Sequence, residues 1–428
     1  MQRNALRKFS KFSENLLPIE VSMKGVIILN VYEKMEIEEK PIFIYGAGIM
    51  GKYIASILKK NNVQLTGFID KSLYKQKQTM ESVPVMGIRE VMNQFGKDIV
   101  VIISPSKIKS IVEFLEAAGI THWHPMCDFI SLSDFINSLS VSELHNARLD
   151  WIKKNWYEHY FFTHTNQLAL ESLDFVLTER CSLRCKECSN LMQYYQCPQN
   201  FSFRILKDEI DKILKVYDFI YELRIIGGEP FMNPETTKII DYVAKSKKIK
   251  EICIYTNGTI LPNDDDLDVL MRTNKVWFTI SDYHELSKNL TKLEAKLKER
   301  GIFYQVTDFL WTRCSRICKH NRSEIELRNI LVDCCVKTTV TLLNGKISPC
   351  PFIANGLNLH ALPMSEEDYV DINHGSIEEI NEKVRSLHSK EFYRLCDYCD
   401  GRPINPKENE FIEPHEQIKQ PLDFIKVF

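Results

Sequence analysis

The chain has 428 residues, of which 44% are hydrophobic and 26% charged, and its formal net charge is −2. These values describe a globular protein long enough for two or three domains, with no basic field for nucleic acid and no polybasic patch for a membrane surface. No apolar stretch approaches the ~20 residues that span a bilayer, and the N-terminus lacks the apolar core of a secretory signal. We therefore expect a cytoplasmic protein without nucleic-acid or membrane partners.

The first domain, expected over residues 1–126, alternates strands with helices. Strands are predicted at 41–45, 65–70 and 99–103, and a helix with Ile54, Ile57 and Leu58 on one face follows the first strand. Gly46-Ala-Gly48-Ile-Met-Gly51 stands after the first strand, and Asp70 closes the second, about twenty residues later. This is the dinucleotide-binding fingerprint in its β-α-β context.

Each glycine of the fingerprint has an expected role in binding a nucleotide. Gly46 allows the tight turn, Gly48 lets the backbone approach a pyrophosphate, and Gly51 permits close helix packing. The segment resembles the small Rossmann-like modules attached to sugar-modifying and glycan-pathway enzymes, which do not uniformly bind nicotinamide cofactors. Binding of a nucleotide or nucleotide sugar and a docking or vestigial role therefore both stay open.

Residues 127–170 are expected to form a helical linker. Phe129, Leu132, Phe135, Ile136 and Leu139 recur at helical spacing. An aromatic stripe follows, comprising Trp151, Trp156, Tyr157, Tyr160 and Phe161. Such a stripe is more often a packing face than a ligand site, so we interpret it as an interdomain brace.

Repeated β-α units are expected over residues 171–309. Strand candidates lie at 175–178, 223–226, 252–255, 276–280 and 303–306, and helix candidates at 203–216 and 286–300. This alternation implies a parallel sheet whose chemistry lies at the carboxyl ends of the strands.

Most of the 13 cysteines fall into two groups, and Cys181, Cys185 and Cys188 begin the first. Clustered cysteines in a chain large enough to build its own core favour metal or cluster binding over disulfides. The C-x3-C-x2-C spacing gathers three thiolates around one side of an iron–sulfur cube and leaves one iron without a protein ligand. Structural zinc is the alternative, although it needs a fourth ligand, for which only Cys197 is near.

Two further motifs follow predicted strands, Gly227-Gly228-Glu229-Pro230 and Tyr255-Thr-Asn257-Gly-Thr259. Together with the cysteine trio they resemble the radical S-adenosylmethionine (radical SAM) enzymes over residues 173–309. The resemblance implies an α/β fold with a partial (β/α)6 barrel, a 4Fe–4S cluster on the trio, and S-adenosylmethionine on the open iron. It also implies reductive cleavage of S-adenosylmethionine to a 5′-deoxyadenosyl radical that abstracts hydrogen from a substrate.

The resemblance assigns roles to single residues. Gly227 and Gly228 approach the methionine moiety, Glu229 faces its ammonium group, and Ser281 with Asp282 matches the ribose contact. Asn257 is expected to face the same cavity. The residue before the third cysteine, often aromatic in the family, is Glu187 here. Tyr194 and Tyr195 are therefore candidates for adenine stacking, with ordinary packing equally open.

Residues 310–428 are expected to form a small cluster-binding module. Cys335, Gly345, Cys350, Cys396 and Cys399 resemble the twitch module, the shortened relative of the SPASM domain, and imply an auxiliary 4Fe–4S cluster. Cys334 competes with Cys335 as a ligand, because either spacing is acceptable. Zinc remains the alternative for this site, and the roles of Cys314 and Cys318 stay open.

An auxiliary cluster suggests a two-electron oxidation in which it accepts the substrate's second electron. Such a step needs a general base, for which Tyr283, His284, Arg313 and His320 are candidates. The Rossmann-like segment favours a carbohydrate or nucleotide sugar as the substrate. A ribosomal-peptide-modifying maturase and a non-catalytic iron–sulfur carrier or scaffold are the alternatives. A low-potential donor such as flavodoxin or ferredoxin is the expected redox partner.

Overall fold

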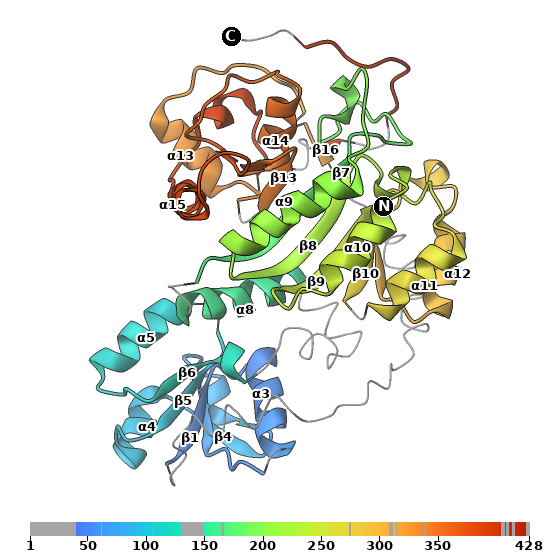
Figure 1. Ribbon diagram of the computed structural model, residues 1–428. Helices are drawn as coiled ribbons and strands as arrows, with labels where there is room; N and C mark the ends of the chain where they lie inside the picture. The colour runs from blue at the N-terminus through green and yellow to red at the C-terminus, as the bar shows by residue number, and fades with distance from the viewer. Residues whose placement is uncertain are drawn as a thin grey trace. The chain divides into compact units, whose positions relative to one another are not determined.

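The computed structural model describes residues 40–60, 62–105, 107–129, 149–163, 167–273, 275–307, 311–313, 315–337, 339–403, 407, 411–412 and 416–424. The chain divides into two compact units, Met1–Asn166 and Gln167–Phe428, and each is described by itself (Figure 1). Leu132, Phe135, Ile136, Leu139 and Cys314, singled out in the sequence, lie outside the described residues. No helix among the described residues is both long and apolar enough to cross a membrane.

The first unit is built on a six-stranded sheet. Its elements are β1 (Ile42–Tyr45), α3 (Ile49–Lys60), β2 (Gly67–Ile69), η1 (Lys75–Lys77), β3 (Thr79–Met80), β4 (Val83–Met86), α4 (Ile88–Phe95), β5 (Val100–Ile103), α5 (Ile108–Ala117), β6 (Trp123–Pro125), η2 (Met126–Asp128) and α8 (Leu149–Thr163). The strand order is β3-β4-β2-β1-β5-β6, with only β3 antiparallel. The predicted parallel sheet is confirmed, and its order is that of a doubly wound sheet with the switch point between β1 and β5.

Burial explains why these segments form the sheet. Every residue of β1 and β5 is buried, as expected for central strands covered on both faces. Ile54, Ile57 and Leu58 form the buried side of α3. In α8, His159 accepts a hydrogen bond from the Met126 amide at 3.3 Å and donates one to the Pro105 carbonyl at 2.7 Å. Helix α8, expected in the linker, therefore packs on the first unit.

The second unit carries the larger sheet. Its elements are β7 (Ala169–Thr178), η3 (Met192–Tyr194), α9 (Phe203–Val216), β8 (Phe219–Gly227), η4 (Pro230–Met232), α10 (Thr236–Ala244), β9 (Ile249–Thr256), α11 (Asp264–Arg272), β10 (Val276–Ser281), η5 (His284–Leu286), α12 (Leu290–Glu299), β11 (Tyr304–Thr307), β12 (Trp311–Thr312), α13 (Glu324–Val332), β13 (Thr339–Leu343), β14 (Lys346–Ser348), α14 (Pro351–Asn358), β15 (Val370–Asp371), α15 (Ile377–His388), η6 (Arg394–Tyr398) and β16 (Phe411–Ile412).

Eight strands adjoin in the order β11-β10-β9-β8-β7-β13-β14-β15. The pairs from β11 to β13 are parallel, whereas β13, β14 and β15 pair antiparallel. The expected parallel sheet is thus confirmed. Strand β13, from the C-terminal module, is hydrogen-bonded directly to β7 of the core, so both segments share one sheet.

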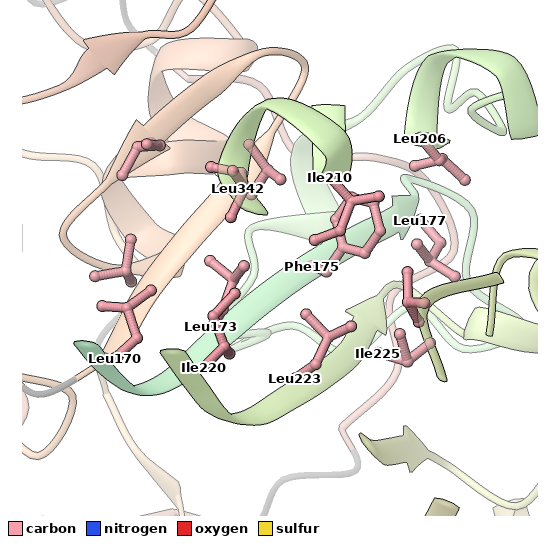
Figure 2. Close-up of a cluster of buried hydrophobic side chains, with 14 of the residues drawn as sticks. Leu170, Leu173, Phe175, Leu177, Leu206, Ile210, Ile220, Leu223, Ile225 and Leu342 are labelled. Carbon is pink, nitrogen blue, oxygen red and sulfur yellow. The ribbon is translucent and has the colours of Figure 1, made fainter. Parts of the chain in front are cut away.

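One face of this sheet is apolar and covered by helices. Figure 2 shows the cluster in which alternate side chains of β7 and β8 meet Leu206 and Ile210 of α9. Phe175, at the centre of β7, is fully buried there. Truncating such a residue to alanine costs about 3–5 kcal/mol, so this cluster holds the strand ends in place.

The opposite face of the same strands is polar. Ser172 of β7 is hydrogen-bonded to Thr339 of β13 at 3.2 Å, and Arg224 of β8 donates to the same Thr339 hydroxyl at 3.3 Å. Arg224 also lies 3.9 Å from the Asp174 carboxylate and is paired with Glu222. Since side chains alternate along a strand, apolar and charged residues one position apart separate cleanly between the two faces.

Local sequence signals determine where helices begin and where a turn forms in the C-terminal module. Helices α13 and α15 both begin with capping boxes, Ser323 with Glu326 and Ser376 with Glu379. Asn344 and Gly345, between β13 and β14, have φ values of 50° and 73°, the positive pair that a type I′ hairpin turn requires. Strands β13 and β14 therefore form a β-hairpin.

Candidate functional site

The carboxyl ends of β7, β8 and β9 bring the three core motifs together. Strand β7 ends at Thr178, just before the cysteine trio; β8 ends at Gly227, and β9 ends at Thr256. Chemistry at this edge is typical of parallel α/β sheets.

The three thiols of the trio lie close enough to affect one another. Burial raises the pKa of Cys181 and Cys188, the latter to about 11, and the neighbouring trio thiols raise both further. Burial also raises the pKa of Cys185. A metal-bound thiol is deprotonated outright, so a cluster at this site would bind the three groups as thiolates.

Gly227 and Gly228 pass directly against the backbone that leads into the trio. Gly227 has φ +147°, and a Cβ there would lie 2.2 Å from the Thr178 carbonyl oxygen; a Cβ on Gly228 would lie 2.1 Å from that of Arg180. The Gly228 amide donates to the Thr178 carbonyl at 3.0 Å, and the Glu229 amide to the Arg180 carbonyl at 2.8 Å. These glycines therefore set the position of the cysteine loop.

Glu229 is fully buried, and its bonds lie within the protein. Its carboxylate accepts hydrogen bonds from the Thr256 hydroxyl and the Asn257 amide, each at 2.9 Å, and from the Phe231 amide at 3.3 Å. Burial raises its pKa to about 7 against these bonds. The carboxylate ties the end of β9 to the Gly-Gly turn.

Asn257 links the end of β9 to the first cysteine. Its Nδ2 donates to the Cys181 Sγ at 3.6 Å and to the Ser182 hydroxyl at 3.1 Å. Its Oδ1 accepts from the Thr259 amide at 3.0 Å. The predicted site residues Asn257 and Cys181 are therefore neighbours.

The ribose candidates and two of the base candidates follow β10. The Ser281 carbonyl accepts from the Ser287 hydroxyl at 3.1 Å, and the Asp282 carboxylate accepts from the His284 amide at 2.8 Å. Burial raises the pKa of Tyr283, and the three trio cysteines add to this rise.

The other two base candidates lie on different segments. Arg313 lines a cavity of about 320 Å³ with Lys186 and Glu187, which stand between Cys185 and Cys188, and with Ile412 and Glu416. The His320 Nε2 lies 3.3 Å from the Asp400 carboxylate, next to Cys399. The structure therefore does not gather the four candidates at one point.

Both tyrosines proposed for stacking have their hydroxyls bonded inside the protein. Tyr194 donates to the Ser315 carbonyl at 3.2 Å, and Tyr195 to the Asn355 side chain at 2.9 Å. The Glu187 carboxylate accepts from the Ser315 hydroxyl at 2.6 Å. These contacts favour the packing interpretation.

The second cysteine group brings together Cys334, Cys350, Cys396 and Cys399. Burial raises the pKa of Cys350 to about 12, and Cys399 and Cys334 raise it further; Cys396 is raised by burial and then by the other three. Cys335, the expected ligand, is exposed, as are Cys197 and Cys318. Of the two adjacent cysteines, Cys334 is therefore the one that meets the other three thiols.

Sequence reasoning did not identify two residues that lie at or near the site, Gln417 and Asp174. Gln417, far along the chain, pairs with Cys185 in an isolated bridge, and its Nε2 donates to the Cys185 Sγ at 3.1 Å. No local pattern signals such a contact. Asp174 is buried on the polar face, where burial raises its pKa to about 6 against Arg224. Its signal was an acid inside the apolar run of residues 173–177.

In the first unit, the fingerprint residues differ in the space around them. A Cβ on Gly46 would lie 2.6 Å from the Ser104 hydroxyl, and one on Gly51 would lie 2.1 Å from the Gly46 carbonyl oxygen, whereas one on Gly48 meets nothing within 4 Å. The Asp70 carboxylate accepts from the Ala47 amide at 2.9 Å and from Lys75 at 3.1 Å. Asp70 therefore fastens the glycine loop.

The trio fits an iron–sulfur cube. Its thiols are close, the glycines admit its loop, and Asn257 and Gln417 donate to its sulfurs as outer-shell partners of a cluster do. Among the described residues, no three His, Cys, Asp or Glu side chains form a group that could hold a single metal ion. A cube spreads its cysteines over different irons, so it does not need such convergence.

Family models match both units. Residues 175–281 match the radical SAM superfamily, and residues 38–126 match a model described as C2185-like, N-terminal. The chain is 38% identical over 95 residues to GTP 3′,8-cyclase of Clostridium acetobutylicum, covering 22% of this chain and 29% of that protein. It is 32% identical over 92 residues to the antilisterial bacteriocin subtilosin biosynthesis protein AlbA of Bacillus subtilis, covering 20% and 18%. These stretches span less than a third of the curated relatives.

Solved structures give weaker likenesses. BtrN in complex with AdoMet and 2-DOIA aligns with a TM-score of 0.38 and 16% identity, covering 58% of this chain and 97% of that one. Native anSMEcpe with bound AdoMet and Cp18Cys peptide gives 0.36 and 14%, covering 58% and 93%. The family match and the strand-end motifs coincide in position, and residues 175–281 therefore form a radical SAM domain; the cofactors that this family implies are a 4Fe–4S cluster and S-adenosylmethionine.

Proposed function

We propose that this protein oxidises or rearranges a carbohydrate or nucleotide sugar, with an auxiliary 4Fe–4S cluster as electron acceptor. Cys181, Cys185 and Cys188 would hold the first cluster, which would supply the electron for reductive cleavage of S-adenosylmethionine. A low-potential donor such as flavodoxin or ferredoxin would reduce that cluster. The chain's own residues position both cofactors and substrate and exclude water.

The observation that carries the proposal is the meeting of four thiols in the C-terminal module. Cys334 precedes β13, Cys350 follows β14, and Cys396 and Cys399 come from the loop around η6. The Cys350 side chain also accepts from the Ile353 amide at 3.4 Å, and the Cys399 Sγ accepts from the Gly401 amide at 3.4 Å. Amide donors to sulfur are the second-shell support that cluster ligands use. We assign Cys334 as the fourth ligand in place of Cys335.

The polar face of the sheet supports a hydroxyl-rich substrate. Asp174, Thr341 and Ser348 are register partners on β7, β13 and β14, and all three are buried. Within the described part of the chain, the Thr341 and Ser348 hydroxyls have no hydrogen-bond partner. Buried polar groups are normally satisfied, so these hydroxyls suit a ligand or ordered water with polar groups.

Two adjacent cysteines offer a matched test of the auxiliary cluster. Anaerobically reconstituted wild-type protein should hold about eight irons per chain, as two cubes require. Cys334→Ser should lower the iron content towards four, whereas Cys335→Ser should leave it unchanged. Four irons plus zinc in the wild type would rule out an auxiliary iron–sulfur cluster. Loss of iron in Cys335→Ser alone would identify Cys335, not Cys334, as the fourth ligand.

Cofactor cleavage tests the enzymatic part. With dithionite and S-adenosylmethionine, the wild type should form 5′-deoxyadenosine, and Cys185→Ala should not. Cys396→Ala should still cleave the cofactor without substrate but should not turn substrate over. No 5′-deoxyadenosine from wild-type protein with a full first cluster would favour the carrier or scaffold alternative.

Peptide modification is the second candidate. It is supported by the similarity to AlbA, which is named as a bacteriocin biosynthesis protein. Product formation from a precursor peptide, and none from sugars or nucleotide sugars, would decide for this candidate.

In either case we propose that the first unit binds a nucleotide or nucleotide sugar at the Gly46–Gly51 loop.

A further inference from the structure

Arg402 reaches from the second cysteine group to the first. It follows Cys399 by three residues and is only 8% exposed. Its Nη2 donates to the Ser189 carbonyl at 2.7 Å, and Ser189 is the residue directly after Cys188. The side chain therefore crosses from the C-terminal module to the cysteine loop of the core.

The backbone around Arg402 is fixed on the side of the module. Its carbonyl accepts a hydrogen bond from the Cys335 amide at 2.8 Å. The next residue, Pro403, pairs with Cys334 in an isolated β-bridge. Cys334 and Arg402 are thus held together by main-chain contacts, which places the guanidinium reproducibly.

The side chain of Arg402 lies between the two cysteine groups. Its guanidinium is bonded to the carbonyl of the residue that follows Cys188, and its backbone lies beside Cys334 through the Cys335 amide and the Pro403 bridge. One cation therefore stands near thiolate ligands of both expected clusters.

A nearby positive charge stabilises the reduced form of an iron–sulfur cluster, because reduction adds negative charge to it. We propose that Arg402 is a positioning residue whose charge raises the reduction potentials of both clusters. This inference rests on the auxiliary cluster of the proposed function. Arginine suits the task because its planar guanidinium stays charged when buried and can bond a carbonyl while facing two sites.

Two substitutions separate charge from hydrogen bonding. Arg402→Gln keeps an N–H donor for the Ser189 carbonyl but removes the charge, whereas Arg402→Lys keeps the charge on a single ammonium group. The measurement is an EPR-monitored potentiometric titration of both clusters in the reconstituted full chain. Arg402→Gln should move both midpoint potentials to more negative values, and Arg402→Lys should move both in the same sense by less.

Arg394→Gln is the matched control. Arg394 belongs to the same module, two residues before Cys396, but its side chain is 63% exposed and its charge partner is Glu367. This control should leave both potentials closer to the wild type than Arg402→Gln does. Equal shifts in the two glutamine variants would overturn the proposal.

Other outcomes of the same titration also test the role of Arg402. Unchanged potentials in Arg402→Gln, or a shift in only one cluster, would overturn the inference while the proposed function stood. If Arg402→Gln loads too little iron, Arg402→Met, which also removes the charge, carries the test: a shift of both clusters to more negative potentials supports the proposal, and unchanged potentials or a shift in only one cluster overturn it. A wild type that holds a single cluster would instead remove the auxiliary cluster itself, and with it the proposed electron acceptor.

Discussion

Both units place a glycine motif at the carboxyl end of a parallel strand, but they use the glycines differently. After β1, Gly48 has open space where a side chain would point. After β8, Gly227 and Gly228 have none, because backbone carbonyl oxygens occupy it. An open glycine leaves room for a ligand's phosphate, whereas a closed one admits a second strand of the protein itself. Similar sequence signals thus report either ligand access or internal packing.

The acids that accompany the two motifs differ in the same way. Burial would raise the pKa of Asp70, but hydrogen bonds from the Ser72 and Ala47 amides and from Lys75 outweigh it and lower the pKa. For Glu229, burial outweighs its hydrogen bonds and raises the pKa to about 7. Asp70 therefore favours folding when charged, and Glu229 when neutral.

The largest effect is expected from Gly228→Ala. The new Cβ would lie 2.1 Å from the Arg180 carbonyl oxygen and 2.8 Å from the Cys181 Cβ, so the cysteine loop must move. We expect a loss on the order of 3 kcal/mol in the stability of the second unit, as for overpacking at a rigid site. Iron content after reconstitution should fall to that of the auxiliary cluster alone. A fully loaded first cluster would show that the contact can relax.

Gly48→Val is the counterpart in the first unit. Because nothing lies within 4 Å of the new Cβ, thermal stability should fall by no more than about 1 kcal/mol, the cost of replacing a glycine N-cap. Binding of a nucleotide probe such as UDP or NAD, measured by calorimetry, should be lost through contact with the phosphate. Unchanged affinity of a wild type that binds the probe would move the binding site elsewhere, and no binding by the wild type would favour a docking role.

The smallest effect is expected from Asp70→Asn, and it depends on pH. A folded-state pKa below the unfolded value gives stability that is present above the unfolded pKa and is lost as pH falls through the folded pKa. At pH 7 the variant should be less stable by roughly 0.5–1 kcal/mol, since solvent screens a partly exposed pair. Urea unfolding should show the difference at pH 7 and a smaller one near pH 3, which lies below the unfolded pKa. An equal difference at both values would point to lost packing.

Periodicity was enough to predict the sheets and several elements. Helix α9 spans the predicted residues 203–216, because its apolar spacing matches a single buried face. Likewise, the Asn344-Gly345 pair is a local signal for the turn before β14, because both positions need a positive φ. Such signals are local, so the sequence carries them directly.

Contacts between distant segments could not be predicted in this way. Spacing permitted either Cys334 or Cys335, and only the folded module distinguishes them, because Cys335 is exposed whereas Cys334 lies with the other three thiols. Gln417 and Arg402 reach the trio loop across more than 200 residues of chain. Nothing in their sequence neighbourhood identifies them, because their position depends on how the module packs on the core.

The pairing of β13 with β7 has a consequence for dissecting this chain. A fragment that ended before residue 310 would lack β13, so the backbone amides and carbonyls on that edge of β7 would have no partner strand. An uncovered strand of that kind is a template for association between copies. The segment that carries the trio is therefore best expressed together with the C-terminal module. Precipitation of a truncated protein would then reflect the unpaired edge of β7, not a damaged cofactor site.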